Sequence, residues 1–160
     1  MINVSVTGLQ EAQNALRKEI EKLVADKKSV LVGIHEGAGQ VEDGTISMAR
    51  LGAIQHFGDD REHIPARPWL DVGVKTGVKD YVSILKDNGD DLDNALNLVG
   101  LVAVGKVQQY MIELKTPKNA PSTIKRKKGV DNPLIDNGAL MQSVTYSITN
   151  EEVKEGLGNG

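Results

Sequence analysis

A chain of 160 residues with a net charge of −3 and no cysteine excludes several classes of protein. A domain of this length buries roughly 70% of its unfolded surface, so a single core is expected. The lack of cysteine excludes disulfides, thiolate catalysis and cysteine-ligated zinc. Proteins that grip phosphates usually carry a basic excess, so the acidic balance argues against dedicated nucleic-acid binding. Aromatic residues make up only 3% of the chain, so the core must be largely aliphatic.

The amino-terminal sequence favours a protein that folds in a cytoplasm. Residues 1–4 lack the basic and apolar regions of a signal peptide. No run approaches the ~18 apolar residues that would predict a membrane span.

The first part of the chain predicts a strand, a helix, a second strand and a second helix. Apolar residues alternate over 2–6, as in a strand, and a helix is predicted over 9–28. Residues 29–35 are almost wholly apolar and predict a central strand. Helical spacing returns over 46–57, with Gly58 placed to end the helix. The apolar face of the first helix consists of Leu9, Ala12, Leu16, Ile20 and Leu23.

The middle of the chain predicts an extended segment and two helices. Two prolines stiffen residues 64–70, and helical spacing follows over 74–85. A long helix of ~35 Å is predicted near residues 92–114. Its middle, residues 98–104, is apolar on every side. We therefore expect this helix to be buried all round or covered by a partner.

The last part of the chain predicts a loop, a short helix, a closing strand and a tail. The proline-containing loop covers residues 116–133, and the short helix begins at Ala139. Residues 144–148 alternate as in a strand, and the polar residues 151–160 predict a disordered tail. The predicted fold class is α+β, with a small, mostly antiparallel sheet packed by helices in one domain over residues 1–150.

No residue pattern predicts a catalytic, cofactor or metal site, and we expect the protein not to be an enzyme. His56 and His63 bracket Asp59, but two histidines seven residues apart match no recurring metal-binding spacing. A small metal-dependent hydrolase that uses these three residues is the least favoured alternative. Adjacent carboxylates at residues 59–60, 90–91 and 151–152 fall in predicted loops, a helix start and the tail, where capping explains 90–91 better.

Lys125, Arg126, Lys127 and Lys128 form the only basic cluster. Such a run suits a contact with an acidic protein, a contact with nucleic acid, or a solvated turn. The cluster lies in a proline-bounded loop that could reach outward, and no aromatic residues interleave it. We therefore favour a protein partner and keep a nucleic-acid-binding module as the alternative.

Three segments in a fixed order carry a resemblance to a known family. Residues 51–58 read LGAIQHFG and residues 64–70 read IPARPWL. Residues 119–146 contain NAPSTIKRKKG, then PLIDNGAL, and lead into SVTY. Together they resemble the tail-completion and virion-morphogenesis proteins of tailed bacteriophages, over roughly residues 46–149.

The resemblance implies a structural virion protein with no catalysis and no cofactor, assembled in the host cytoplasm. Such proteins form a ring, commonly six-fold, at the head-proximal end of the tail or in the neck. They complete the tail and join it to the head. The implied partners are further copies of the chain, the tail tube protein and head connector or neck proteins. DNA would pass through the ring, which suits an acidic chain, and no membrane is involved.

We expect a partner interface to include Arg67, Trp69 and the basic cluster. The guanidinium of Arg67 offers a planar fork for carboxylates or backbone carbonyls. Trp69 is the only tryptophan, and the sequence leaves open whether its ring anchors an interface or the core. Asp136 and Gly138 are predicted to cap and turn the chain ahead of Leu140.

Overall fold

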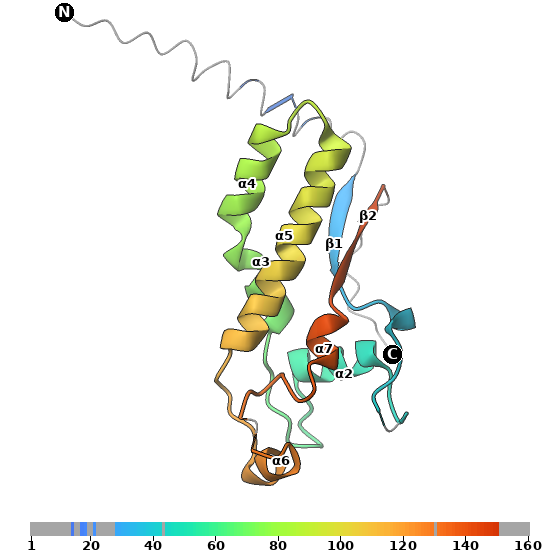
Figure 1. Ribbon diagram of the computed structural model, residues 1–160, viewed down its shortest axis with the longest axis vertical. Helices are drawn as coiled ribbons and strands as arrows, with labels where there is room; N and C mark the ends of the chain where they lie inside the picture. Colours follow the sequence, from blue (N-terminus) through green and yellow to red (C-terminus); the bar gives the residue numbers. More distant parts are fainter. Residues whose placement is uncertain are drawn as a thin grey trace, which may run out of the picture.

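The computed structural model describes residues 28–42, 44–129 and 131–150, together with residues 14, 17, 18 and 21. Over these residues the predicted α+β class is confirmed: six α-helices accompany one antiparallel sheet of two strands (Figure 1). The elements are β1 (Ser29–Gly33), the 3-10 helix η1 (Glu36–Ala38), α2 (Met48–Phe57), α3 (Trp69–Thr76), α4 (Val78–Asp87), α5 (Leu92–Glu113), α6 (Pro121–Arg126), α7 (Ala139–Gln142) and β2 (Thr145–Thr149).

Two predicted segments lie outside the described residues, namely the strand over 2–6 and the tail over 151–160. Of the helix predicted over 9–28, the described residues 14, 17, 18 and 21 are helical and exposed.

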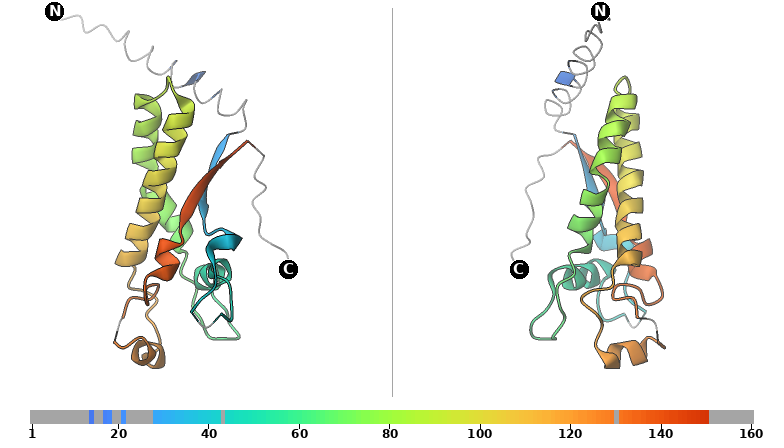
Figure 2. Two further views of the ribbon diagram at one scale, coloured as in Figure 1. Left: turned by 45° about the vertical axis from the view of Figure 1, so that its right-hand side comes forward. Right: turned by 90° about the vertical axis from the view of Figure 1, so that its left-hand side faces the viewer.

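The predicted long helix is confirmed as α5, the central element of the fold. The carboxylate of Asp91 caps its start by accepting a hydrogen bond of 3.0 Å from the backbone N–H of Asn94. At 1.5 Å per residue the helix is ~33 Å long. It packs against α3, α4, β1 and β2, with α4 and the sheet on different sides of it (Figures 1 and 2).

By the length and hydropathy of its sequence alone, α5 could cross a membrane. Its packing in the fold explains this hydropathy on one side, where five apolar side chains are buried: Ala95, Leu96, Ala103, Val107 and Met111. The opposite side is different, because Leu101 is 59% exposed and Ile112 is 44% exposed. The expectation of burial all round is therefore wrong for the described chain, and coverage by a partner stays a prediction.

The sheet lies against α5 because one glycine makes room for it. β1 and β2 pair in the register Leu31 with Ser147 and Val32 with Tyr146. A side chain at Gly100 of α5 would overlap the ring of Tyr146, so the strand can approach only at a glycine. The prediction of a central strand is corrected for β1, since its single described neighbour is β2 and none of its residues is buried.

The second predicted helix is confirmed as α2. The Ser47 hydroxyl caps it by accepting a hydrogen bond of 3.2 Å from the N–H of Arg50. The helix ends at Gly58, whose φ of 79° favours glycine. A tight turn follows, in which Asp59 pairs with Ile64 through two backbone hydrogen bonds of 2.8 Å.

Two predictions for the middle of the chain are corrected. The segment predicted to be extended over 64–70 stops at Pro68, and α3 begins at Trp69. The helix predicted over 74–85 is two helices that meet at Gly77. The physical reason is Tyr81, whose ring occupies the space beside Gly77 and whose hydroxyl donates a hydrogen bond of 2.9 Å to the carbonyl oxygen of Val74.

In the turn ahead of Leu140, the side chain that bonds to the backbone belongs to Asn137 and not to Asp136. Gly138 adopts φ 84°, which confirms its predicted role in the turn. The side chain that accepts the N–H of Ala139, over 3.0 Å, belongs to Asn137. The prediction that Asp136 caps the chain here is therefore wrong: Gly138 is the N-cap residue of α7, and the side chain that bonds within the turn belongs to Asn137.

Candidate functional site

The candidate site lies at the end of the molecule where α5 finishes. Figures 1 and 2 show α6 beyond the last turn of α5, at the opposite end from the turn between α4 and α5. The loop after α2, the segment 64–70 and the residues on either side of α6 meet here. These are the parts of the three segments that carry the family resemblance.

Arg67 is buried at 2% exposure, and its guanidinium group joins the segment 64–70 to α2 and to residues 117–119. Its Nε donates to the carbonyl oxygen of Pro117 over 2.9 Å, and a terminal nitrogen donates to Oε1 of Gln55 over 2.9 Å. The other terminal nitrogen donates to the carbonyl oxygen of Lys118 and to Oδ1 of Asn119, over 3.3 and 3.4 Å. Burial lowers the pKa of the Arg67 guanidinium. Among the described ion pairs none involves Arg67, so neutral oxygens solvate its charge.

Trp69 holds the same region to the core. Its side chain is 3% exposed, and the indole N–H donates a hydrogen bond of 3.1 Å to the carbonyl oxygen of Gly52 in α2. The ring lies edge-on to His56, with 6.0 Å between ring centroids. The backbone of residues 64–66 crosses Gly58 so closely that a Cβ there would lie 2.7 Å from the nitrogen of Ala66. The GAIQHFG and IPARPWL segments therefore form one packed unit.

Asn132 connects this unit to the end of α5. Its Nδ2 donates to the carbonyl oxygens of Met111 and Ile112, which are among the last of the helix. Its Oδ1 accepts the backbone N–H groups of Leu134 and Ile135, over 2.9 and 3.0 Å. Its own carbonyl oxygen accepts hydrogen bonds from the side chains of Asn119 and Lys127. One asparagine thus satisfies six polar groups from four parts of the chain.

The basic cluster divides into one buried and three exposed side chains. Lys127 is 8% exposed, and its Nζ donates a hydrogen bond of 2.7 Å to the carbonyl oxygen of Asn132. Desolvation by burial lowers the pKa of the Lys127 ammonium, while Asp136 opposes this shift. Lys125, Arg126 and Lys128 are exposed. From Leu114 to Gly129 the sequence holds six basic residues and no acidic residue, so the local charge is opposite in sign to the charge of the whole chain.

The predicted interface residues are therefore only partly available to a partner. For Arg67, Trp69 and Lys127 the expectation of partner-facing side chains is corrected, because their polar atoms bind oxygens of the same chain. Lys125, Arg126 and Lys128 face solvent at the tip of the molecule. No sequence pattern predicted the role of Asn132. The Asn-Pro pair that it forms with Pro133 is a turn signal that could have drawn attention to it.

The residues of the hydrolase alternative do not converge. His56 is buried in α2, where its Nδ1 has no hydrogen-bond partner among the described residues and its Nε2 lies 3.7 Å from a carboxylate oxygen of Asp71. His63 is exposed in the turn after α2, and the side chain of Asp59 accepts backbone N–H groups within that turn. Within the described ranges no group of three or more histidine and acidic side chains could hold a metal ion.

A shallow hollow lies beside the exposed basic tip. Asp60, His63 and Pro65 line one wall, and residues 118–120 line the other. The walls carry charges of both signs and the hollow is open to solvent, so it suits contact with a protein surface better than enclosure of a small molecule.

Comparison with known proteins returns no relative, since no protein-family model, no curated protein and no solved structure matches this chain.

Proposed function

We propose that this chain is a non-catalytic structural protein of a tailed-bacteriophage virion. In this proposal it acts at the head-proximal end of the tail or in the neck, as an oligomeric ring that completes the tail and joins it to the head. Its partners are further copies of itself, the tail tube protein and head connector proteins, and it assembles in the host cytoplasm.

The observation that carries the proposal is the role of the motif residues in the fold. In an enzyme, the polar residues of a signature usually converge on a cleft with free functional groups. Here the side chains of Arg67, Trp69 and Asn132 donate hydrogen bonds to backbone carbonyl groups of the same chain. Motif residues with this role stabilise the fold of the chain, and an assembly protein needs a stable surface to contact its neighbours.

The exposed cationic side chains at the α6 end of the molecule could bind an acidic surface of a partner protein. Lys125, Arg126 and Lys128 have ammonium or guanidinium groups free of ion pairs in the described part of the chain. Opposite charge on a partner would speed association and select the correct surface. An acidic patch on a tail or connector protein is the partner that this tip fits.

Virion composition tests the proposal directly. Particles purified from a host that carries the gene would be digested and searched by mass spectrometry for peptides of this chain. Gold particles directed against a tagged copy would be located by electron microscopy. We expect labelling where the tail meets the head. Tailed particles that form normally and lack the chain would refute the proposal.

A nucleic-acid-binding module is the second candidate, and the stretch 114–129, with six basic residues and no acidic residue, favours it. Binding of this type would weaken steeply as salt is raised, because counterions are released from the phosphates. Fluorescence anisotropy with a labelled duplex and with a single strand, between low and physiological salt, decides between the two candidates. We expect no binding at physiological salt; tight binding that is lost in a triple variant of Lys125, Arg126 and Lys128 would favour this second function.

A further inference from the structure

The solvent-facing side of α5 carries an apolar stripe that the described chain leaves uncovered. We call it the α5 seam and define it by Leu98, which is half-buried, and by Leu101, Gly105 and Ile112, which are exposed. These residues follow the spacing i, i+3, i+7 and i+14, so they lie on one face of the helix over ~21 Å. Leu101 and Ile112 are among the most exposed large apolar side chains of the described residues. Apolar residues at this spacing are typical of a helix that packs along another helix.

The described residues give no explanation for Gly105. A glycine in a helix interior costs about 1 kcal/mol relative to alanine. At Gly73 and Gly100 neighbouring groups account for the glycine, because a Cβ would collide with Val107 and Tyr146. At Gly105 a Cβ would meet nothing within 4 Å. A side chain arriving from outside the described chain would explain the missing Cβ at the centre of the seam.

The amino-terminal sequence contains a partner of matching pattern. Leu9, Ala12, Leu16 and Leu23 follow the same spacing, i, i+3, i+7 and i+14, in the predicted helix. The four described residues of that helix are exposed and polar: Asn14, Arg17, Lys18 and Glu21. They belong to the face opposite the leucines. The leucine-bearing face is therefore the one that requires a covering surface.

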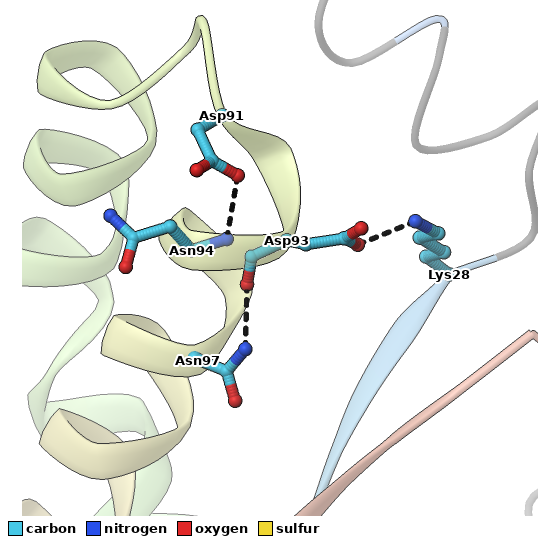
Figure 3. A network of polar contacts seen from close by, with 5 residues as sticks. All are labelled: Lys28, Asp91, Asp93, Asn94 and Asn97. Atoms are coloured by element: carbon cyan, nitrogen blue, oxygen red, sulfur yellow. Dashed lines mark hydrogen bonds and ion pairs between the residues drawn. The ribbon is translucent and has the colours of Figure 1, made fainter.

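The place where this segment joins the fold is fixed by an ion pair. The ammonium of Lys28 lies 2.5 Å from a carboxylate oxygen of Asp93 in the first turn of α5 (Figure 3). The residues between Leu23 and Lys28 include neither glycine nor proline, the strongest signals for a chain reversal. The sequence therefore favours a segment that continues past its own α5 over one that folds back along it.

From these observations we propose that the α5 seam binds the amino-terminal helix, residues 9–23, of a second copy of the chain. The inference rests on the proposed function, because the contact would join neighbouring subunits of the ring. When the two stripes are aligned over their full length, Leu16 lies opposite Gly105 whether the two helices run parallel or antiparallel. The seam thus offers its smallest residue where the incoming helix has a leucine, which is a knob-into-hole arrangement. Each copy gives one surface and receives another, and such head-to-tail contacts form a ring when the rotation between neighbouring copies closes.

Cysteine cross-linking tests the proposal, since the natural chain has no cysteine to interfere. The full-length double variant Leu16→Cys with Gly105→Cys would be oxidised with copper phenanthroline over a concentration series. We expect reducible covalent oligomers larger than a dimer on a denaturing gel. The matched control pairs Lys18→Cys, on the polar face, with Gly105→Cys, and we expect it to stay largely uncross-linked.

Two outcomes would overturn the inference. A double variant that forms only an intramolecular disulfide would show that the segment covers its own seam. A variant that forms no disulfide at any concentration would show that the seam has another occupant. Neither result changes whether the chain is found in virions, so failure here is distinguishable from failure of the proposed function.

A substitution on the seam gives a second measurement that does not depend on disulfide geometry. Leu101→Glu should weaken self-association at least about 30-fold in sedimentation experiments, because a central apolar anchor is lost. Its circular dichroism and thermal midpoint should match those of the natural chain, because Leu101 is exposed in the protomer. Val82→Glu, at an exposed apolar residue of α4, is the matched control and should leave association unchanged. Equal effects of the two substitutions would overturn the proposal.

Discussion

The indole N–H of Trp69 and the carbonyl oxygen of Gly52 are joined by a hydrogen bond of 3.1 Å. This bond links the first residue of α3 to a residue in the first turns of α2. It occurs inside the cluster that also contains Met48, Val107 and Leu140. The carbonyl of Gly52 is therefore satisfied beyond its helical bond, and the tryptophan ring has one defined orientation.

Replacement of Trp69 by phenylalanine should lower the free energy of unfolding by about 1–3 kcal/mol. The ring would still fill most of the space, but one buried hydrogen bond and part of the packing would be lost. Urea unfolding followed by circular dichroism measures the change. In the natural chain the emission of this single tryptophan should be blue-shifted and should move to the red on unfolding. Emission typical of water-exposed indole in the native protein would contradict the buried placement.

Replacement of Arg67 by methionine should lower the free energy of unfolding by about 2–4 kcal/mol. The substitution keeps an apolar stem and leaves the carbonyl oxygens of Pro117 and Lys118 without their donor. Arg67→Lys should recover only part of the loss, because an ammonium cannot reproduce the planar fork. Arg61→Met, at an exposed arginine, is the control and should change stability by less than about 0.5 kcal/mol. Equal stabilities of the variants at both positions would contradict the structural role of Arg67.

Neutralisation of Lys125 and of Lys127, two members of the basic cluster, should change the free energy of unfolding by different amounts. Lys127→Met should cost about 1 kcal/mol, since it removes the hydrogen bond to the carbonyl oxygen of Asn132. The loss is moderate because Asn119 still donates to the same oxygen. Lys125→Met should change the free energy of unfolding by less than about 0.5 kcal/mol, because its side chain is exposed. Chemical denaturation of the two single variants measures this contrast, and similar values would refute it.

Two glycines of α5 should give stability changes of opposite sign when replaced by alanine. Gly105→Ala should raise the free energy of unfolding by about 0.5–1 kcal/mol in the monomer, because alanine restricts the unfolded chain and nothing obstructs its Cβ. Gly100→Ala should lower it by about 1–3 kcal/mol, because the methyl group forces Tyr146 and the sheet away from the helix. Thermal unfolding at low protein concentration compares the two. A stabilised Gly100→Ala variant would mean that the sheet does not pack at this position.

Tyr81 should contribute to a loss of stability above pH 10. Burial raises the pKa of its phenol above the ordinary value of 10.0, with Lys106 opposing and Asp80 assisting the shift. Between the unfolded and the folded pKa the unfolded state has already released the proton that the folded state retains. The free energy of unfolding therefore falls as pH rises through this interval. Urea titrations between pH 9 and pH 11 should show a shallower decline in Tyr81→Phe, and an identical decline in both proteins would rule out this role.

Local sequence patterns were sufficient to predict several elements of the fold. The length of α5, the end of α2 at Gly58 and the turn at Gly138 follow from helical spacing and from glycine at positive φ. These features depend on residues close together in the chain, so they can be predicted from the sequence without knowledge of the tertiary structure. The α+β class follows from the same local signals.

Tertiary contacts decided the rest. The break between α3 and α4 depends on where the Tyr81 ring packs, and the approach of the sheet depends on Gly100 facing Tyr146, a partner 46 positions away in the sequence. Likewise, Lys127 is buried and Lys125 exposed within one run of cations, because the carbonyl oxygen of Asn132 reaches only the former. The sequence by itself determined which residues are charged, apolar or flexible. Which of them face the interior depended on long-range packing, since hydrogen-bond partners such as Arg67 and Pro117 become neighbours only after the chain has folded.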